Sequence, residues 1–284
     1  MMKQSLLALT VLAALSGCSL DGDDGAQGPV GEVGAPGTPG EDGKNLPREL
    51  DIAVVGRFNT GIYGQSAAEI VQFHKASKSA FAINAAQNRI EVIPLSALPV
   101  TSVGSPVSDD SLTSTAFTFP DSVTVKNAAG NDVTINLGEA NSIAIYADML
   151  AIAVAAPLKT DNGAVLFYSL SATGVGTFVK AVSVGALPDM LTFTPDGSKV
   201  LVANEGEPDT DYLADPEGSV SVIGLSDGVP ADVAATINLT SNMVFSSDLL
   251  DEADYDTDAK RRALLQAAGA KFAGPAGTTV AQDL

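Results

Sequence analysis

Residues 190–204 read MLTFTPDGSKVLVAN, two runs rich in apolar residues on either side of a short polar segment. In that segment Pro195 restricts φ, the Asp196 side chain can cap a turn, and Gly197 tolerates backbone conformations that are closed to other residues. The stretch therefore predicts an antiparallel β-hairpin with a tight turn at its tip.

The same layout of strand, tight turn, apolar strand, longer loop and outer strand recurs along the chain. The predicted strands are Ile52–Val55, Glu69–Phe73, Ser79–Asn84 and Arg89–Ile93; Ser142–Tyr146, Met149–Val154 and Ala164–Tyr168; and Met190–Phe193, Lys199–Asn204 and Ser219–Ile223. These sets repeat roughly every 50 to 70 residues, a spacing that suits β-propeller blades carrying insertions. We therefore predict an all-β fold, a β-propeller with YVTN- or WD40-like blades.

Two further elements are expected between or beside the blades. A hairpin is predicted from Ser122–Lys126 and Asp132–Leu137, around a polar turn. A helical insertion is predicted near 256–269, with its helix at Ala259–Ala268, Asp256 or Thr257 as the cap and Gly269 as the terminator.

Several short motifs resemble the choice-of-anchor I proteins, which are surface proteins similar to the mesenchyme-specific cell-surface glycoprotein group. The motifs are Ala68–Val71 with Ala82–Asn88, Leu187–Met190, Asn204–Pro208 and Asp215–Val220. The resemblance covers about residues 50–284 and implies a β-propeller body. Because the family body is longer, it also implies an incomplete propeller here, with more blades expected after Leu284.

The N-terminus has the composition of an export signal. Lys3 supplies a positive charge, Ser5–Leu15 form a short apolar core, and small residues precede Cys18. This pattern resembles a bacterial lipobox, which implies cleavage after residue 17 and lipidation of Cys18, palmitate included. The resemblance also places the chain at the outer membrane, because Ser19 rather than aspartate follows the cysteine. The alternative is an ordinary secretory signal with an incidental cysteine.

Glycine occupies every third position from Gly22 to Gly43, within a predicted linker that covers residues 18–49. This is the collagen period, since only glycine fits at the axis of a triple helix. Two interpretations are open: a trimeric stalk, or an extended spacer in a monomer. The small number of triplets favours the spacer. The folded body would then cover residues 50–284.

The charge balance narrows the classes of partner. The chain has 15 Lys and Arg against 34 Asp and Glu, a formal charge of −19. Such a surface repels nucleic acid and attracts divalent cations and basic partners. His74 is the single histidine, which argues against histidine-rich metal sites. We expect His74 to be exposed in a turn at a strand end rather than catalytic. Arg57 is a weaker candidate for a binding residue at a blade edge.

One acid-rich loop is the best candidate for a binding site. Between residues 205 and 217 it carries six carboxylates and no basic residue: Glu205, Glu207, Asp209, Asp211, Asp215 and Glu217. Calcium is the cation that such a loop would favour, because it accepts six to eight oxygen ligands in flexible geometry. The alternative is a solvated acidic loop. A second acidic run, 254–258, imitates an EF-hand loop but lacks its glycine and its final glutamate.

Together these features predict a surface-anchored bacterial lipoprotein. Its partners would be the lipid membrane, through acylated Cys18, and an unidentified surface protein or glycan bound by the propeller. Catalysis is not expected. The alternative, implied by labels on some relatives of the resembling family, is a metal-dependent phosphatase- or nucleotidase-type hydrolase, alkaline phosphatase-like, whose remaining site would lie beyond residue 284.

Overall fold

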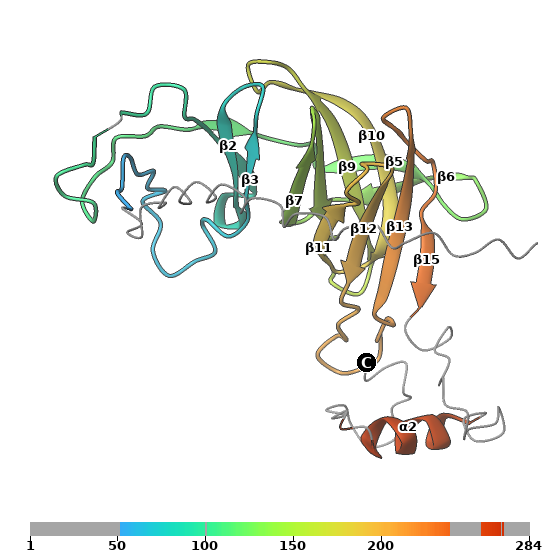
Figure 1. Cartoon of the computed structure of the whole chain (residues 1–284). Helices are drawn as coiled ribbons and strands as arrows, with labels where there is room; N and C mark the ends of the chain where they lie inside the picture. Colours follow the sequence, from blue (N-terminus) through green and yellow to red (C-terminus); the bar gives the residue numbers. More distant parts are fainter. Residues whose placement is uncertain (1–51, 100, 239–256, 268, 270–284) are drawn as a thin grey trace, which may run out of the picture. The chain divides into compact units, whose positions relative to one another are not determined.

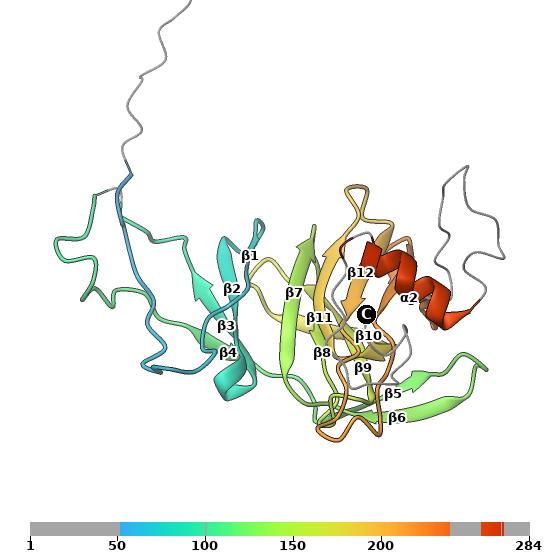
Figure 2. The ribbon, with the colours of Figure 1, turned by 90° about the horizontal axis from the view of Figure 1, so that it is seen from below.

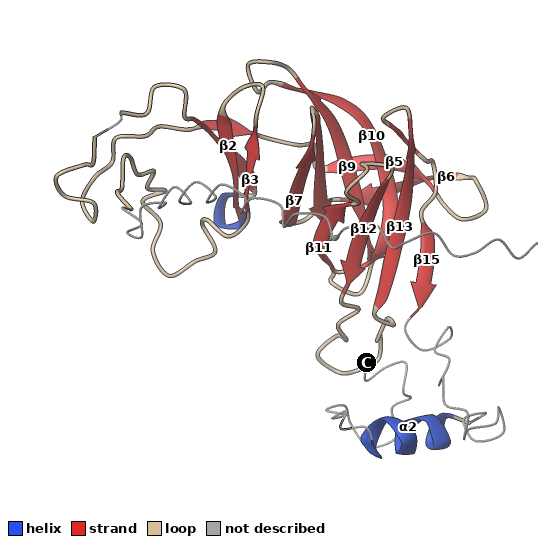
Figure 3. Ribbon diagram, viewed as in Figure 1, coloured by secondary structure: helices blue, strands red, loops and turns tan. Residues whose placement is uncertain are grey.

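The computed structural model describes residues 52–99, 101–238, 257–267 and 269. The chain divides into two compact units, Met1–Asp51 and Ile52–Leu284, and all described residues belong to the second. The predicted export signal and collagen-like segment lie outside the described residues. The regular structure is almost entirely antiparallel β (Figures 1 and 3), so the predicted all-β class is confirmed.

The first sheet contains β1 to β4 in chain order. Its strands are β1 (Val71–His74), β2 (Ser79–Asn84), β3 (Arg89–Pro94) and β4 (Thr115–Phe117). A single 3₁₀ turn, Ala85–Gln87, links β2 to β3. The predicted strand at 52–55 was wrong, because these residues form no ladder. Val54 instead accepts one backbone hydrogen bond, from Val103 at 2.8 Å.

The second sheet has the order β10-β9-β8-β7, again following the chain. Its strands are β7 (Ala140–Tyr146), β8 (Met149–Val154), β9 (Asn162–Leu170) and β10 (Gly176–Ala186). The third sheet runs β11-β12-β13-β14, with β15 also paired to β13. Its strands are β11 (Pro188–Phe193), β12 (Lys199–Asn204), β13 (Ser219–Ser226), β14 (Val229–Pro230) and β15 (Ala235–Asn238).

The two additional elements are also present. The predicted hairpin is β5 (Ser122–Lys126) paired with β6 (Asp132–Asn136). Helix α2 spans Asp258–Ala267; the Thr257 hydroxyl accepts a bond from the Lys260 amide, and Gly269 follows with φ of 99°. The other predicted cap, Asp256, lies outside the described residues. Among the helices of the described part, none is long and apolar enough to cross a membrane.

The second sheet is buried on both faces, which explains why β8 and β9 read as nearly continuous apolar runs. Leu166 and Tyr168 of β9 join a core with the first sheet, whereas Val165 and Phe167 point the other way into a core with the third sheet. Strand β7 contacts β1 on one side and β11 on the other (Figure 2). The first strands of the three sheets therefore lie next to one another in chain order.

Candidate functional site

The acid-rich loop connects β12 to β13 and is closed by the pairing of Asn204 with Ser219. Gly206 holds the loop together: its φ is +67°, and a Cβ there would lie 2.5 Å from the Pro216 carbonyl oxygen. Only glycine fits this combination of conformation and close approach. The two ends of the loop therefore pack directly against each other.

A buried polar cluster supports the base of this loop. The Asn204 amide nitrogen donates to the hydroxyls of Ser219, at 3.1 Å, and Ser221, at 2.9 Å. All three side chains are at most 5% exposed. A Cβ on Gly185 of the neighbouring β10 would lie 2.8 Å from both Asn204 and Ser219, so glycine is required for that strand to approach.

The carboxylates of the loop make separate contacts rather than meeting at one point. Glu207 forms an ion pair with Lys159 at 2.9 Å. Asp209 accepts bonds from the amides of Leu213 and Ala214, at 2.8 and 3.2 Å, so this carboxylate shapes the loop itself. Asp211 is exposed and Asp215 and Glu217 are half-buried.

Glu205 has an unfavourable electrostatic environment. Burial and the nearby charges of Asp189 and Glu207 raise the pKa of its carboxyl above its ordinary value. Within the described residues, no three His, Cys, Asp or Glu side chains are placed to hold a metal ion. Calcium binding by this loop therefore stays a prediction, and it would require these carboxylates to move together.

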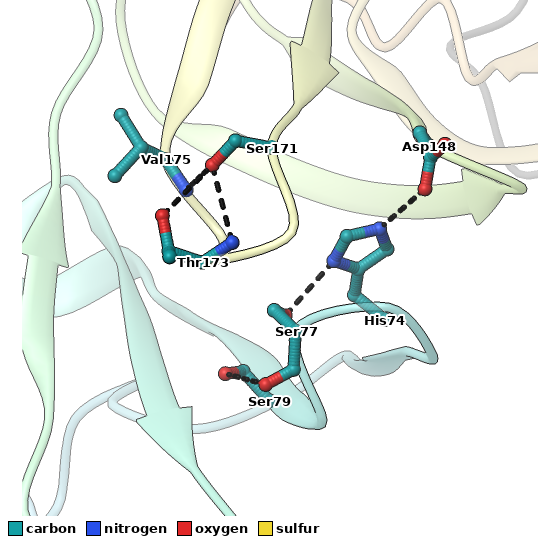
Figure 4. A network of polar contacts seen from close by, with 7 residues as sticks. All are labelled: His74, Ser77, Ser79, Asp148, Ser171, Thr173 and Val175. Carbon is teal, nitrogen blue, oxygen red and sulfur yellow. Dashed lines mark hydrogen bonds and ion pairs between the residues drawn. The ribbon is translucent and has the colours of Figure 1, made fainter.

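His74 contradicts the prediction that it is exposed, because its side chain is fully buried. Its Nδ1 lies 2.9 Å from the Ser77 hydroxyl in the turn that follows β1, and its Nε2 lies 3.0 Å from Asp148 in the turn between β7 and β8 (Figure 4). The ring also meets Phe81 edge-on at 6.2 Å between centroids. The contact was not predicted from the sequence because Asp148 is 74 residues from His74 along the chain.

Serine, histidine and aspartate are also the side chains of a nucleophilic triad, but the arrangement here fits a structural role better. The serine lies in the turn directly after the strand that ends at the histidine, and the Asp148 side chain is 66% exposed. Asp148 lies in the turn between β7 and β8 of the second sheet, and His74 ends β1 of the first. The contact therefore joins two sheets.

Glu91 is a buried carboxylate that sequence reasoning also missed, with 1% of its area exposed. Burial by itself would raise the pKa of Glu91, but hydrogen bonds from Ser114, Asn84 and Arg89 outweigh it and leave the pKa below its ordinary value. The donor atoms lie 2.6 to 2.8 Å away. The group anchors the long β3–β4 loop. The same loop is also held by the Arg57 guanidinium, which lies before β1 and donates to the Val107 carbonyl rather than lying free at an edge.

These features define an all-β protein of consecutive antiparallel sheets, with polar clusters at the strand ends. The chain belongs to the choice-of-anchor I domain family, whose model matches residues 69–284. This membership indicates a surface-associated protein. No curated protein matches the sequence.

Several solved structures are similar to part of the chain. A candidate 6-phosphogluconolactonase from Bacteroides fragilis is 17% identical, with a TM-score of 0.40 over 61% of this chain and 39% of that one. A protein of unknown function from Desulfotomaculum acetoxidans is 12% identical, with a TM-score of 0.36 over 62% and 49%. Kuenenia stuttgartiensis hydrazine synthase is 16% identical, with a TM-score of 0.32 over 64% and 53%. The chain thus spans about half or less of each of these three proteins.

Proposed function

We propose that the chain is an exported bacterial lipoprotein, held at the outer membrane by acylated Cys18, whose body is part of a β-propeller that binds a surface protein. The segment 18–49 would act as an extended spacer that lifts the body from the lipid surface, at about 3 Å per residue. The body would have no catalytic activity of its own. The observation that carries this proposal is the family match over 69–284, joined to a lipobox-like N-terminus.

The arrangement of the sheets supports the propeller. Each sheet is a simple antiparallel meander, and the first strand of each contacts the first strand of the next. The outward faces of the first and third sheets both expose apolar side chains. Val71 is 62% and Phe73 56% exposed on β1, and Met190 is 51% and Ile237 48% exposed on the third sheet. In a propeller such faces pack against further blades.

The membrane affinity of acyl chains and the charge of the body both support anchoring through Cys18. A single acyl chain gives only marginal membrane binding, so the several chains carried by a bacterial lipoprotein would be needed for stable attachment. The strongly acidic body would not add to it, because anionic headgroups repel a chain with a formal charge of −19. Attachment would therefore depend on Cys18.

Fractionation of cells that produce the full chain tests this proposal. We expect the wild type in the outer-membrane fraction, resistant to extraction with high salt and released by detergent. The Cys18→Ser variant should be soluble. Ser16→Ala, which keeps a small residue before the cysteine, serves as the control and should remain in the membrane. A membrane-bound Cys18→Ser protein would contradict the proposal.

A further inference from the structure

We infer that a groove at the turn ends of the second and third sheets binds a basic, apolar-containing peptide segment of a partner protein. The groove has a volume of about 490 Å³, within the range of ligand-binding sites. It lies between the β7–β8 turn of one sheet and the β11–β12 and β13–β14 turns of the next. We call it the turn groove. The inference rests on the proposed binding role and names the class of partner.

The floor of the turn groove is apolar and aromatic. Tyr146 and Phe193 lie with ring centroids 5.8 Å apart and planes tilted by 33°, and Tyr146 is 40% exposed. Met149 and Leu225 complete the floor, each half-buried at the margin of the second core. Gly197 makes room for the tyrosine, since a Cβ there would lie 2.1 Å from its ring. An aromatic floor of this kind attracts cations as well as apolar groups.

The rim carries one carboxylate from each of three turns: Asp148, Asp196 and Asp227. Asp196 is held by hydrogen bonds from the Thr194 hydroxyl, the Ser198 amide and the Ser198 hydroxyl, at 2.6, 3.0 and 2.9 Å. These bonds, that of Thr194 first, lower the pKa of Asp196 to about 2, so it is charged at any physiological pH. Asp227 is exposed in a turn with φ of 51°.

The negative charge of the rim favours a positively charged ligand in the turn groove. No lysine, arginine or histidine is among the described residues that line the groove. Lys199, near the β11–β12 turn, alternates with buried Val200 and so belongs to the opposite face of β12. Asp196 and Asp227 lie on separate turns, and Asp148, one oxygen of which contacts His74, lies on a third, so the rim favours a ligand with several cations rather than one. An arginine- or lysine-containing segment with intervening apolar residues supplies both parts, since the cations meet the rim and the apolar groups meet the floor.

Fluorescence anisotropy with the full chain in a non-ionic detergent tests the inference independently of anchoring. The probe is a fluorescein-labelled peptide of alternating arginine and leucine. We expect saturable binding in 50 mM salt that weakens as salt increases. Asp196→Asn/Asp227→Asn should weaken it by about tenfold, and Tyr146→Leu by about threefold, since each removed partner contributes modestly.

The matched control is Asp110→Asn/Asp121→Asn, which removes the same charge from exposed positions outside the groove. It should change the affinity less than twofold. Equal weakening by this control, or equal binding of a glutamate–leucine peptide, would overturn the inference, as would no saturable binding up to 1 mM peptide. Displacement of the peptide by equimolar choline or spermidine would show that the groove binds small cations, and would overturn the inference that its ligand is a peptide. Thermal melts show that each variant is folded.

Discussion

At the scale of single residues, burial depends on partners that the local sequence does not reveal. His74 ends β1 between exposed Phe73 and exposed Lys75, and the polar turn after it predicts that the side chain is solvated. It is buried because Phe81 of β2 and Asp148 of the β7–β8 turn approach it. Glu91 is similar, since its three donors are spread from Asn84 to Ser114. Both sites were missed because sequence patterns report faces of elements, not contacts between them.

Removal of the buried imidazole should destabilise the fold. We expect His74→Ala to lower the free energy of unfolding by about 2–3 kcal/mol, because it opens a gap beside Phe81 and removes bonds to Ser77 and Asp148. Urea denaturation followed by circular dichroism measures this. Exposed Lys75→Ala should stay within about 0.5 kcal/mol. Equal midpoints for the two variants would show that the contact contributes nothing.

Glu205 should make stability depend on pH. Because its pKa is raised in the folded state above 4.5, the folded chain binds this proton more tightly, and stability falls as pH rises from 4.5 through the folded pKa. At pH 7 Glu205→Gln should therefore raise the melting temperature, by about 1–2 °C for so exposed a group. At pH 3 it should have no effect. Glu139→Gln, also exposed, is the control. A lower melting temperature for Glu205→Gln at pH 7 would show that the charge of Glu205 is not destabilised by burial and by Asp189 and Glu207.

At the scale of elements, strands with regular composition were predictable. Strands β2, β8 and β12 have the predicted bounds, because each is an uninterrupted run between turn residues. The longest strand, β10, was missed. It begins at a glycine, and its pairing with β9 shifts register twice. Each shift interrupts the alternation of inward and outward side chains by which a strand is recognised in the sequence. The edge strands β4 and β15 were also missed.

The acid-rich loop should depend on Gly206 for its closure. Gly206→Ala places a Cβ against the Pro216 carbonyl in a left-handed conformation and should cost about 1–3 kcal/mol of unfolding free energy. Gly224→Ala in β13 is a matched control, since a Cβ there meets nothing within 4 Å. Chemical denaturation compares the two. If both variants unfold alike, the close approach of the loop ends is not a constraint.

Calcium binding by the same loop has its own test. If the loop gathers its carboxylates around the ion, millimolar calcium should raise the melting temperature of the wild type by mass action. Asp209→Asn/Asp211→Asn should reduce that rise. Magnesium at the same concentration controls for ionic strength. Melting temperatures that do not respond to calcium in either protein would leave the loop as a solvated connection shaped by Asp209.

At the scale of the whole molecule, the order of the sheets was predictable, but the packing contacts between them were not. Turn residues and strand spacing specified three successive antiparallel sets, which the structure contains. The contacts between sets are made by side chains from both faces of the second sheet, such as Val165 and Leu166. The candidate calcium ligands were identified by composition alone, and the structure places them in separate contacts. The turn groove has no sequence signal, because its lining comes from five separate strands and their turns.

Tethering of the body through Cys18 is tested by mass spectrometry of the mature N-terminal peptide. Membrane-extracted protein should give an N-terminal peptide that begins at Cys18 and carries the added mass of a diacylglycerol and an amide-linked acyl chain. Cys18→Ser should give no such species. A wild-type peptide that begins at another residue, or at an unmodified Cys18, would show that the chain is not anchored through this cysteine.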